Sequence, residues 1–355
     1  MHSDRPNRFM LNLGQLASTV QRNCDISDAR HVGDFTLCVF LLKMREYYRW
    51  ENEIPFSGAL PNQDVGEWLQ ERERMWNALE SSPFEPLPLE SGSRDPFDTE
   101  TVNAELVPRG YVYSGGYGRF SKPHFFLGDL VRSERRQGFT VYLSSCEYAR
   151  DLVAPPAMLL GNEIYVRQES VRRFLWERIE EARGNRNNNA MARVHEWYGF
   201  DRDLDGALER MTANETETMI LHELGEGLAG RLLGDGWNEM LAGLTRSKAE
   251  IMARAVRDLL ADCLSTLPAL IDRENIPGIH FYFATFSGMR RYLFPEATDA
   301  YARFAADGDL RPLRRAVHDG LDRWTETATA IARLYRDRGE DAGSAVERML
   351  EHTPI

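Results

Sequence analysis

Apolar residues recur at helical spacing near the start of the chain. The run DARHVGDFTLCVFLLKMREYYRWE, from Asp28 to about Glu51, has this pattern and predicts one helix with Asp28 as its N-cap. A second helix is predicted over EWLQERERMWNALES, residues 67–81, because its large apolar residues fall on one stripe. We expect the two helices to pack as an antiparallel pair.

The pattern changes in two steps after the second helix. Residues 81–100, SSPFEPLPLESGSRDPFDTE, are rich in proline, serine and acidic residues and contain a glycine, and they predict a long surface loop. The segments that follow, GYVYSGG, HFFLGDLV, FTVYLSS and NEIYVR, are rich in β-branched and aromatic residues and are separated by glycine-containing turns. They predict about three to five short antiparallel strands within residues 110–167.

Helical spacing resumes at SVRRFLWERIEEAR and continues to DLRPLRRAVHDGLDRWTETATAIARLYRDRG near the end of the chain. The sequence therefore predicts an α+β fold that is predominantly α-helical, with a small antiparallel sheet inserted at about residues 110–167. Residues 1–100 form a helical pair and a long loop, residues 101–168 the β region, and residues 169–355 a helical domain. We expect these regions to form one compact unit.

Charge and hydropathy narrow the classes of partner. The formal net charge is -12 and the isoelectric point is near 5.3, whereas nucleic-acid binding requires a concentrated basic surface. No apolar run has the length of a membrane span, and the first residues, MHSDRPNRFM, lack the apolar core of a signal peptide. We expect a cytoplasmic protein with no nucleic-acid partner and no membrane association.

The cysteines add no cross-link or metal motif to this interpretation. The four cysteines are far apart and form no CxxC pair, so neither a disulfide framework nor a zinc knuckle is indicated. Cys38 and Cys263 lie in apolar helical patterns, which predicts that both are buried, inert thiols.

One short segment carries candidate chemistry. Residues 220–230 read ILHELGEGLAG, within a predicted helix. Residues four apart share a helix face, so His222 and Glu226 can both ligate one ion, while Glu223 lies about 100° round the helix, near enough to act on a metal-bound water. Apolar runs flank these polar residues, which predicts that His222 and Glu226 are at least partly buried and require partners.

Residues 219–230 resemble the active-site helix of the zincin metallopeptidases, whose motif is HExxH. Glu226 stands where the second histidine of that motif would be. The resemblance implies a metal held by His222 and Glu226, with Glu223 as the general base. A mixed histidine and carboxylate set is competent for zinc and is well suited to iron or manganese.

A metal site needs at least one more ligand, and two residues are the best candidates. Asp262 is flanked by apolar residues on a predicted helix, and His280 begins the aromatic segment HFYFATF. Gly225 and Gly227 lower the helix propensity of the motif by about 1 kcal/mol each, which predicts that another element packs closely against that surface.

Two functions from different classes remain open. The first is a metal-dependent enzyme holding zinc, iron or manganese, either a hydrolase or a non-haem iron oxidase, with an unknown substrate. The second is a non-catalytic helical ligand-binding or scaffold protein without a metal, whose aromatic segments form a groove for a small-molecule or peptide ligand. In the second case ordinary side-chain pairs would satisfy His222, Glu223 and Glu226.

Overall fold

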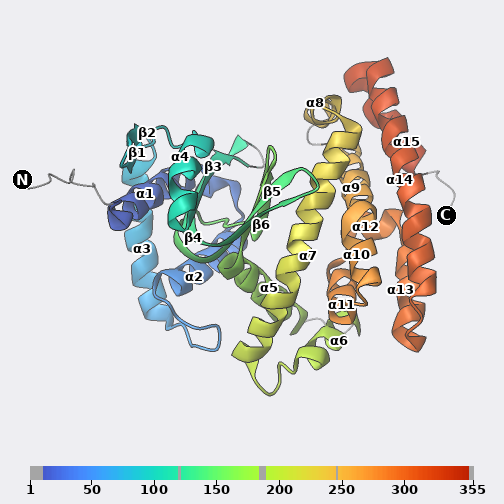
Figure 1. The fold of residues 1–355 in the computed structure, drawn as a ribbon, viewed down its shortest axis with the longest axis horizontal. Helices are drawn as coiled ribbons and strands as arrows, with labels where there is room; N and C mark the ends of the chain where they lie inside the picture. The colour runs from blue at the N-terminus through green and yellow to red at the C-terminus, as the bar shows by residue number, and fades with distance from the viewer. Residues whose placement is uncertain (1–10, 119–120, 184–188, 245–246, 352–355) are drawn as a thin grey trace, which may run out of the picture. The chain divides into compact units, whose positions relative to one another are not determined.

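The computed structural model describes residues 11–118, 121–183, 189–244 and 247–351, and it has the predicted α+β fold with helices dominant (Figure 1). The first ten residues, on which the signal-peptide argument depends, lie outside this range. The chain divides into two compact units. The first comprises Met1–Glu134, Thr140–Pro156 and Tyr165–Arg173, and the second Arg135–Phe139, Ala157–Ile164 and Phe174–Ile355.

The elements up to residue 167 are four α-helices, two short 3-10 helices (Val32–Asp34 and Val107–Arg109) and seven strands among the described residues. The helices are α1 (Leu13–His31), α2 (Leu37–Glu51), α3 (Asn62–Leu79) and α4 (Thr99–Leu106). The strands are β1 (Leu87–Leu89), β2 (Gly92–Arg94), β3 (Tyr111–Tyr117), β4 (Pro123–Arg136), β5 (Phe139–Arg150), β6 (Ala157–Leu160) and β7 (Glu163–Arg167).

Five of the strands form one curled, mixed sheet in the order β3-β4-β5-β7-β6. β3 and β4 are antiparallel, with Tyr111 opposite Asp129 and Tyr117 opposite Pro123. This sheet occupies the region where strands were predicted. The segment predicted to be only a loop also contains the short antiparallel pair of β1 and β2, and the start of α4.

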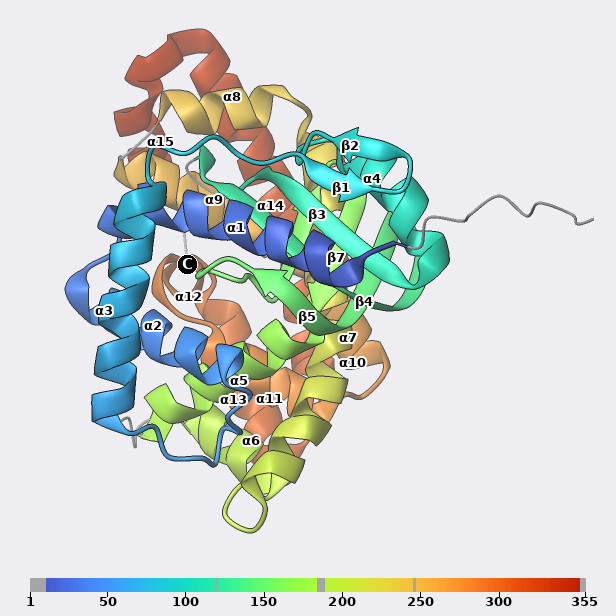
Figure 2. The ribbon, with the colours of Figure 1, turned by 90° about the vertical axis from the view of Figure 1, so that its left-hand side faces the viewer.

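Helix α1 was not predicted, and its position corrects the expected role of Asp28. The first helix ends at His31 and a separate helix begins at Leu37, so Asp28 lies inside α1 and does not cap a helix running to Glu51. α1 lies against the sheet in Figure 2, where the Cys24 thiol donates a hydrogen bond to the Phe125 carbonyl of β4. Its sequence pattern is obscured because α1 buries polar residues, namely Asn23, Asp25, Ser27 and Asp28.

Helix α2 leaves much of its apolar sequence exposed. Leu37 is 70% exposed and Leu42 63% exposed, while Phe40 and Met44 are buried with residues of α1 and α3. Cys38 is also exposed, so the prediction that it is buried was wrong, whereas Cys263 is buried as predicted. An apolar run shows that a helix has at least one buried face, but it does not exclude apolar residues on the other.

The second unit is built around long helices. Its described helices are the part of α5 (Gln168–Arg183) that follows Arg173, and α6 (Asn189–Tyr198), α7 (Leu204–Leu233), α8 (Gly236–Gly243), α9 (Lys248–Ala261), α10 (Leu267–Asp272), α11 (Ile276–Thr285), α12 (Gly288–Leu293), α13 (Pro295–Asp307), α14 (Arg311–Arg338) and α15 (Gly343–Glu351). Figure 1 shows α9 between α7 and α14, and its apolar residues belong to the main core of this unit.

Two glycines of α7 allow other elements to approach closely, as their cost in helix propensity predicted. A Cβ built at Gly225 would lie 2.4 Å from the backbone oxygen of Ala261, at the end of α9. A Cβ built at Gly227 would lie 2.4 Å from Cζ of Phe139. Both distances are below van der Waals contact, so no larger residue fits without displacing backbone or an aromatic ring.

Within the described residues, no helix has both the length and the apolar character needed to cross a membrane.

The contact at Gly225 can be tested by replacing two glycines of the same helix. We expect Gly225→Ala to lower the free energy of unfolding by about 1–3 kcal/mol, because the added methyl group meets the Ala261 carbonyl. Gly230 has open space around it, so Gly230→Ala should raise the free energy of unfolding by up to about 1 kcal/mol. Urea denaturation followed by circular dichroism measures both changes, and equal effects would contradict the close contact.

Candidate functional site

The candidate site forms where α7 meets an irregular helical segment between α9 and α10. Residues Asp262–Thr266 form a single π-helical segment between α9 and α10. Such segments occur frequently at functional sites because the extra residue redirects the side chains around it. The close approach at Gly225 brings α7 to this segment, and His222, one turn earlier on α7, lies next to Asp262.

His222 lies between two carboxylates. Its Nδ1 is 3.3 Å from Asp262 Oδ1, and its Nε2 is 3.4 Å from Glu226 Oε1. Burial disfavours the charged imidazole, but the hydrogen bonds to Asp262 and Glu226 outweigh burial and raise the pKa of His222 well above its ordinary value. Without a bound ion, the ring is therefore held as an imidazolium between two anions.

Asp262 is buried and uses both oxygens. Oδ1 faces His222, while Oδ2 accepts hydrogen bonds from Tyr282 Oη at 2.7 Å and from Arg290 Nη1 at 3.0 Å. Burial would raise the pKa of Asp262, but the hydrogen bond and charge of His222, together with Arg290, keep it below its ordinary value. The sequence prediction that Asp262 is buried is confirmed, and its partners explain how a buried carboxylate is tolerated.

Glu226 also faces an arginine and a second carboxylate. Arg257 Nη2 is 3.6 Å from Glu226 Oε2 and 3.3 Å from Asp258 Oδ1. Burial opposes ionisation of Glu226, but the hydrogen bond with His222 and the charge of Arg257 lower its pKa to about 2. Glu226, Arg257 and Asp258 are all partly exposed, so this part of the cluster is open to solvent.

Glu223 lies beside the pair but is more deeply buried. Burial raises the pKa of its carboxyl to about 7, against the opposing charge of His222, and the Leu159 backbone of β6 donates a hydrogen bond to it. One helix face thus carries carboxyls whose environments drive their pKa values in opposite directions, down for Glu226 and up for Glu223. Such pairs are common where one group must hold a charge and another must transfer a proton.

The structure does not bring His280 to this cluster. Its Nδ1 lies 3.0 Å from Tyr301 Oη, and its ring packs against Phe304. Burial, with a smaller contribution from Arg193, lowers the pKa of His280 to about 4, so this histidine is neutral at physiological pH. Within the described chain, His280 has no hydrogen bond or ion pair with His222, Glu226 or Asp262.

Three members of the cluster were not identified from the sequence as site residues. Tyr282, Arg290 and Arg257 each contact one of the predicted residues through side chains on a different helix or a different face. Arg290 is 28 positions from Asp262, and no helical or strand spacing relates the two. Over the residues that the structure covers, no three histidine, cysteine or acidic side chains are arranged to hold a metal ion as they stand.

A separate group of buried charges lies in the first unit. Lys122 Nζ is 2.7 Å from Asp28 Oδ1, and the Leu152 backbone donates a hydrogen bond of 2.7 Å to Asp28 Oδ2. Burial raises the pKa of Asp28 to about 7, against the opposing charge of Lys122. Nearby, His124 Nε2 and Asp151 Oδ2 are buried without a hydrogen-bond partner in the described residues. These interactions attach α1 to the chain just before β4 and just after β5.

Helix α7 buries one more carboxyl, more than one turn before the site. Glu215 is fully buried, and its Oε1 accepts a 2.9 Å hydrogen bond from Asn214 Nδ2. Hydrogen bonds from Thr218 and Asn214 favour its charged form but do not offset the effect of burial. Burial raises the pKa of Glu215 to about 7, so the neutral acid is the form that the fold favours.

Two sequence models of one family match the chain. The model described as the N-terminal domain of a family of unknown function, DUF6866, matches residues 15–167, and the model of its C-terminal domain matches residues 172–353. The chain therefore belongs to this family, and the cluster around His222 lies in the C-terminal domain. No curated protein and no solved structure matches the chain.

The burial of Glu215 predicts a pH dependence of stability. Because its pKa is about 7 in the folded state, the folded protein binds more protons than the unfolded chain between about pH 4.5 and 7. The contribution of Glu215 to the free energy of unfolding should therefore fall by up to about 3 kcal/mol as the pH rises through this range. Glu215→Gln should remove this fall.

Glu217→Gln is the matched control for this experiment. Glu217 pairs with Arg136 and Arg273, and these interactions lower its pKa despite partial burial. Its stabilisation is present above the unfolded pKa and is lost as the pH falls, which is the opposite sign. Urea denaturation at pH 5 and pH 8 measures the fall due to Glu215. Both pH values lie above the range in which the Glu217 stabilisation is lost, so Glu217→Gln should keep the wild-type difference between them. A Glu215→Gln variant with the pH dependence of the wild type would show that Glu215 is not buried as a neutral acid.

Proposed function

We propose that this member of the DUF6866 family is a metal-dependent enzyme in which His222 and Glu226 bind a divalent ion and Glu223 acts as the base. The ion is zinc, iron or manganese, which accept mixed imidazole and carboxylate ligands. The observation that carries the proposal is the separation of 3.4 Å between His222 Nε2 and Glu226 Oε1.

This separation suits two ligands of one ion. Metal-to-ligand bonds of about 2.0–2.2 Å in a tetrahedral arrangement place two donor atoms about 3.4 Å apart. A charge-assisted hydrogen bond would instead bring the nitrogen and oxygen to about 2.7–2.9 Å. The spacing of His222 and Glu226 is longer than that of a strong hydrogen bond and is compatible with two ligands of one ion.

The environment of the other ring nitrogen supports the same assignment. A carboxylate behind a metal-binding histidine orients the ring and increases its basicity. Asp262 is in that position at Nδ1 and is itself held by Tyr282 and Arg290. In this proposal Asp262 orients His222 and is not the third ligand expected from the sequence, and His280 takes no part.

In this proposal Asp258 becomes the third ligand once its side chain and that of Glu226 turn toward the ion. It shares Arg257 Nη2 with Glu226, so a divalent ion would replace the guanidinium as their common counter-charge. An ion bound there supplies a Lewis acid and lowers the pKa of water at its open position. Glu223, the residue after His222 on α7, is then the group that accepts the proton.

The charges around the pair favour an anionic substrate. The side chains of Arg257 and Arg290 are 22% and 26% exposed and lie within the same cluster, where they can bind a carboxylate or phosphate group. With zinc or manganese the proposed reaction is hydrolysis at a carbonyl or similar centre. With iron the same residues could support oxygen chemistry, so the metal decides the reaction class.

A second function, that of a non-catalytic ligand-binding or scaffold protein without a metal, is favoured by a different observation. His222, Asp262 and Glu226 already satisfy one another's charges, and Arg257 neutralises the open side of Glu226. In that case the cluster is an ion-pair network that fixes α7 against α9 and the π-helical segment. Its cost in desolvation would be offset by the hydrogen bonds to each member.

Metal analysis of the wild type and three variants, His222→Gln, Glu226→Gln and His280→Gln, distinguishes the two functions. After reconstitution with zinc, iron(II) or manganese(II) and removal of free metal, we expect about one equivalent in the wild type. His222→Gln and Glu226→Gln, which keep similar size, should retain less than about a tenth of it, because each removes one of the two proposed ligands. Inductively coupled plasma mass spectrometry gives the ratio directly.

His280→Gln is the control, because it removes a buried histidine of the same unit that lies outside the proposed site. It should retain the wild-type metal content. Circular dichroism establishes that all four proteins are folded. Absence of metal from the reconstituted wild type, or equal metal in every variant, would exclude the enzyme as proposed and leave the metal-free network.

A further inference from the structure

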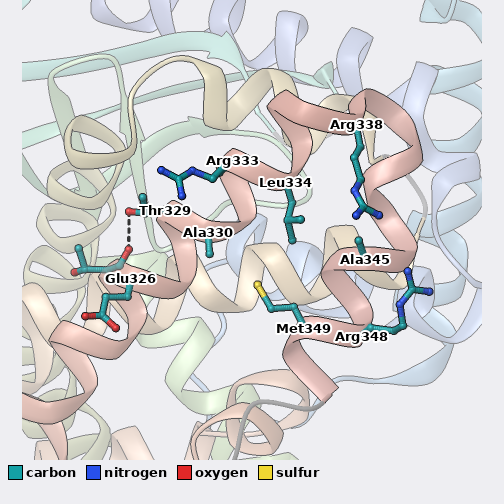
Figure 3. A pocket seen from close by; sticks show the side chains of 10 residues that line it. Glu326, Thr329, Ala330, Arg333, Leu334, Arg338, Ala345, Arg348 and Met349 are labelled. Atoms are coloured by element: carbon teal, nitrogen blue, oxygen red, sulfur yellow. Dashed lines mark hydrogen bonds between the residues drawn. The ribbon is translucent and has the colours of Figure 1, made fainter.

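A pocket lies between the last two helices of the second unit, apart from the cluster around His222. Its volume is about 1000 Å³. Figure 3 shows its walls, which are α14 and α15, the two helices joined by the short turn Gly339–Ala342. The lining residues are Thr325, Glu326, Thr329, Ala330, Arg333, Leu334, Arg338, Ala345, Arg348 and Met349.

The floor of the pocket is apolar. Ala330 and Leu334 are one turn apart on α14, and Ala345 and Met349 are one turn apart on α15, so each helix presents one apolar stripe. Leu334 and Met349 are partly buried against the main core. The two alanines leave the space between the stripes open. A ligand seated here would remove apolar surface from water on both sides.

Three of the ten lining residues are arginines. Arg333, Arg338 and Arg348 line the pocket of a protein whose formal net charge is -12. Arg333 and Arg338 are exposed, and neither forms an ion pair with a carboxylate in the described residues. Cationic groups without carboxylate partners beside an apolar floor provide charge complementarity for an anion with an apolar body.

The polar groups are divided between the two ends of the pocket. Figure 3 shows Arg338 near the turn between the helices and Arg348 farther along α15 beside Met349, while Glu326 and Thr329 lie on the opposite side of the pocket. The Thr329 hydroxyl donates a hydrogen bond to the Thr325 carbonyl, so it is occupied within α14. The negative charge of Glu326 is thus remote from the Arg338 end, which therefore favours the anionic part of a ligand.

From this arrangement we propose that the pocket between α14 and α15 binds a small amphiphilic anion. Its carboxylate, sulfonate or phosphate group binds Arg338, and its apolar body lies over Leu334 and Met349. The volume is at the upper end of pockets that enclose small molecules, and such pockets combine an apolar lining with a few placed charges. The proposal is independent of metal binding at His222.

A matched pair of fluorescent dyes tests this proposal on the full chain. 8-Anilinonaphthalene-1-sulfonate carries an anionic group, and N-phenyl-1-naphthylamine is the same ring system without it. We expect saturable binding of the sulfonate dye to the folded protein. Arg333→Gln/Arg338→Gln should weaken its affinity at least tenfold and leave the affinity for the neutral dye within about twofold, because only the charge has been removed.

Two further variants locate the binding. Arg336→Gln removes an exposed arginine of α14 that does not line the pocket, and it should bind both dyes as the wild type does. Ala345→Phe fills the space between the helices without changing charge and should weaken the binding of both dyes. Decanoate should displace the sulfonate dye, whereas decyltrimethylammonium should not, because the two share an apolar chain and differ in the sign of the head group.

Several results would overturn the proposal. One is an equal affinity of the sulfonate dye for the wild type and for the Arg333→Gln/Arg338→Gln variant. Another is an Ala345→Phe variant with wild-type affinities, which would place the dye elsewhere. Binding of an acidic polypeptide with no binding of either small anion below millimolar concentration would identify the surface as a protein-docking site instead. Circular dichroism of each variant shows that a loss of affinity is not a loss of fold.

Discussion

The contact between α7 and the end of α9 is the constraint on which the candidate site depends. Gly225 has no side chain, and a methyl group there would overlap the Ala261 carbonyl. This approach places His222 beside Asp262, which is buried and requires partners. Tyr282 and Arg290 donate the other hydrogen bonds that Asp262 accepts. The buried charge is tolerated because four helical segments converge on it.

The electrostatic balance of the cluster follows from this arrangement. A histidine between two carboxylates is stabilised as a cation, and each carboxylate is in turn held ionised by the histidine and by an arginine. The same arrangement serves a metal ion if the ring is neutral, because Asp262 then orients it and Nε2 faces Glu226. A structural ion-pair network and a metal site thus use the same side chains and differ in which cation lies beside Glu226.

Prediction from sequence succeeded where apolar patterns are regular and failed where polar groups are buried. Most helices after residue 168, the strand region and the close packing at Gly225 and Gly227 were indicated by spacing and propensity, whereas the short helices α8 and α15 were not. Helix α1 was missed because it buries carboxyl and amide groups against partners more than sixty residues away, as with Asn23 and Glu85. Periodicity methods detect apolar faces and do not detect polar groups satisfied by distant parts of the chain.

The sequence by itself determined that His222, Glu223 and Glu226 share a helix, since a repeat of about 3.6 residues sets their spacing. It also determined that Asp262 lies in an apolar surrounding and is buried. Only the tertiary structure decided which nitrogen of His222 faces Asp262, that His280 contacts Tyr301, and that Arg257 and Arg290 join the cluster. These contacts depend on how separate helices pack, and local sequence patterns carry no information about the distance between side chains on different helices.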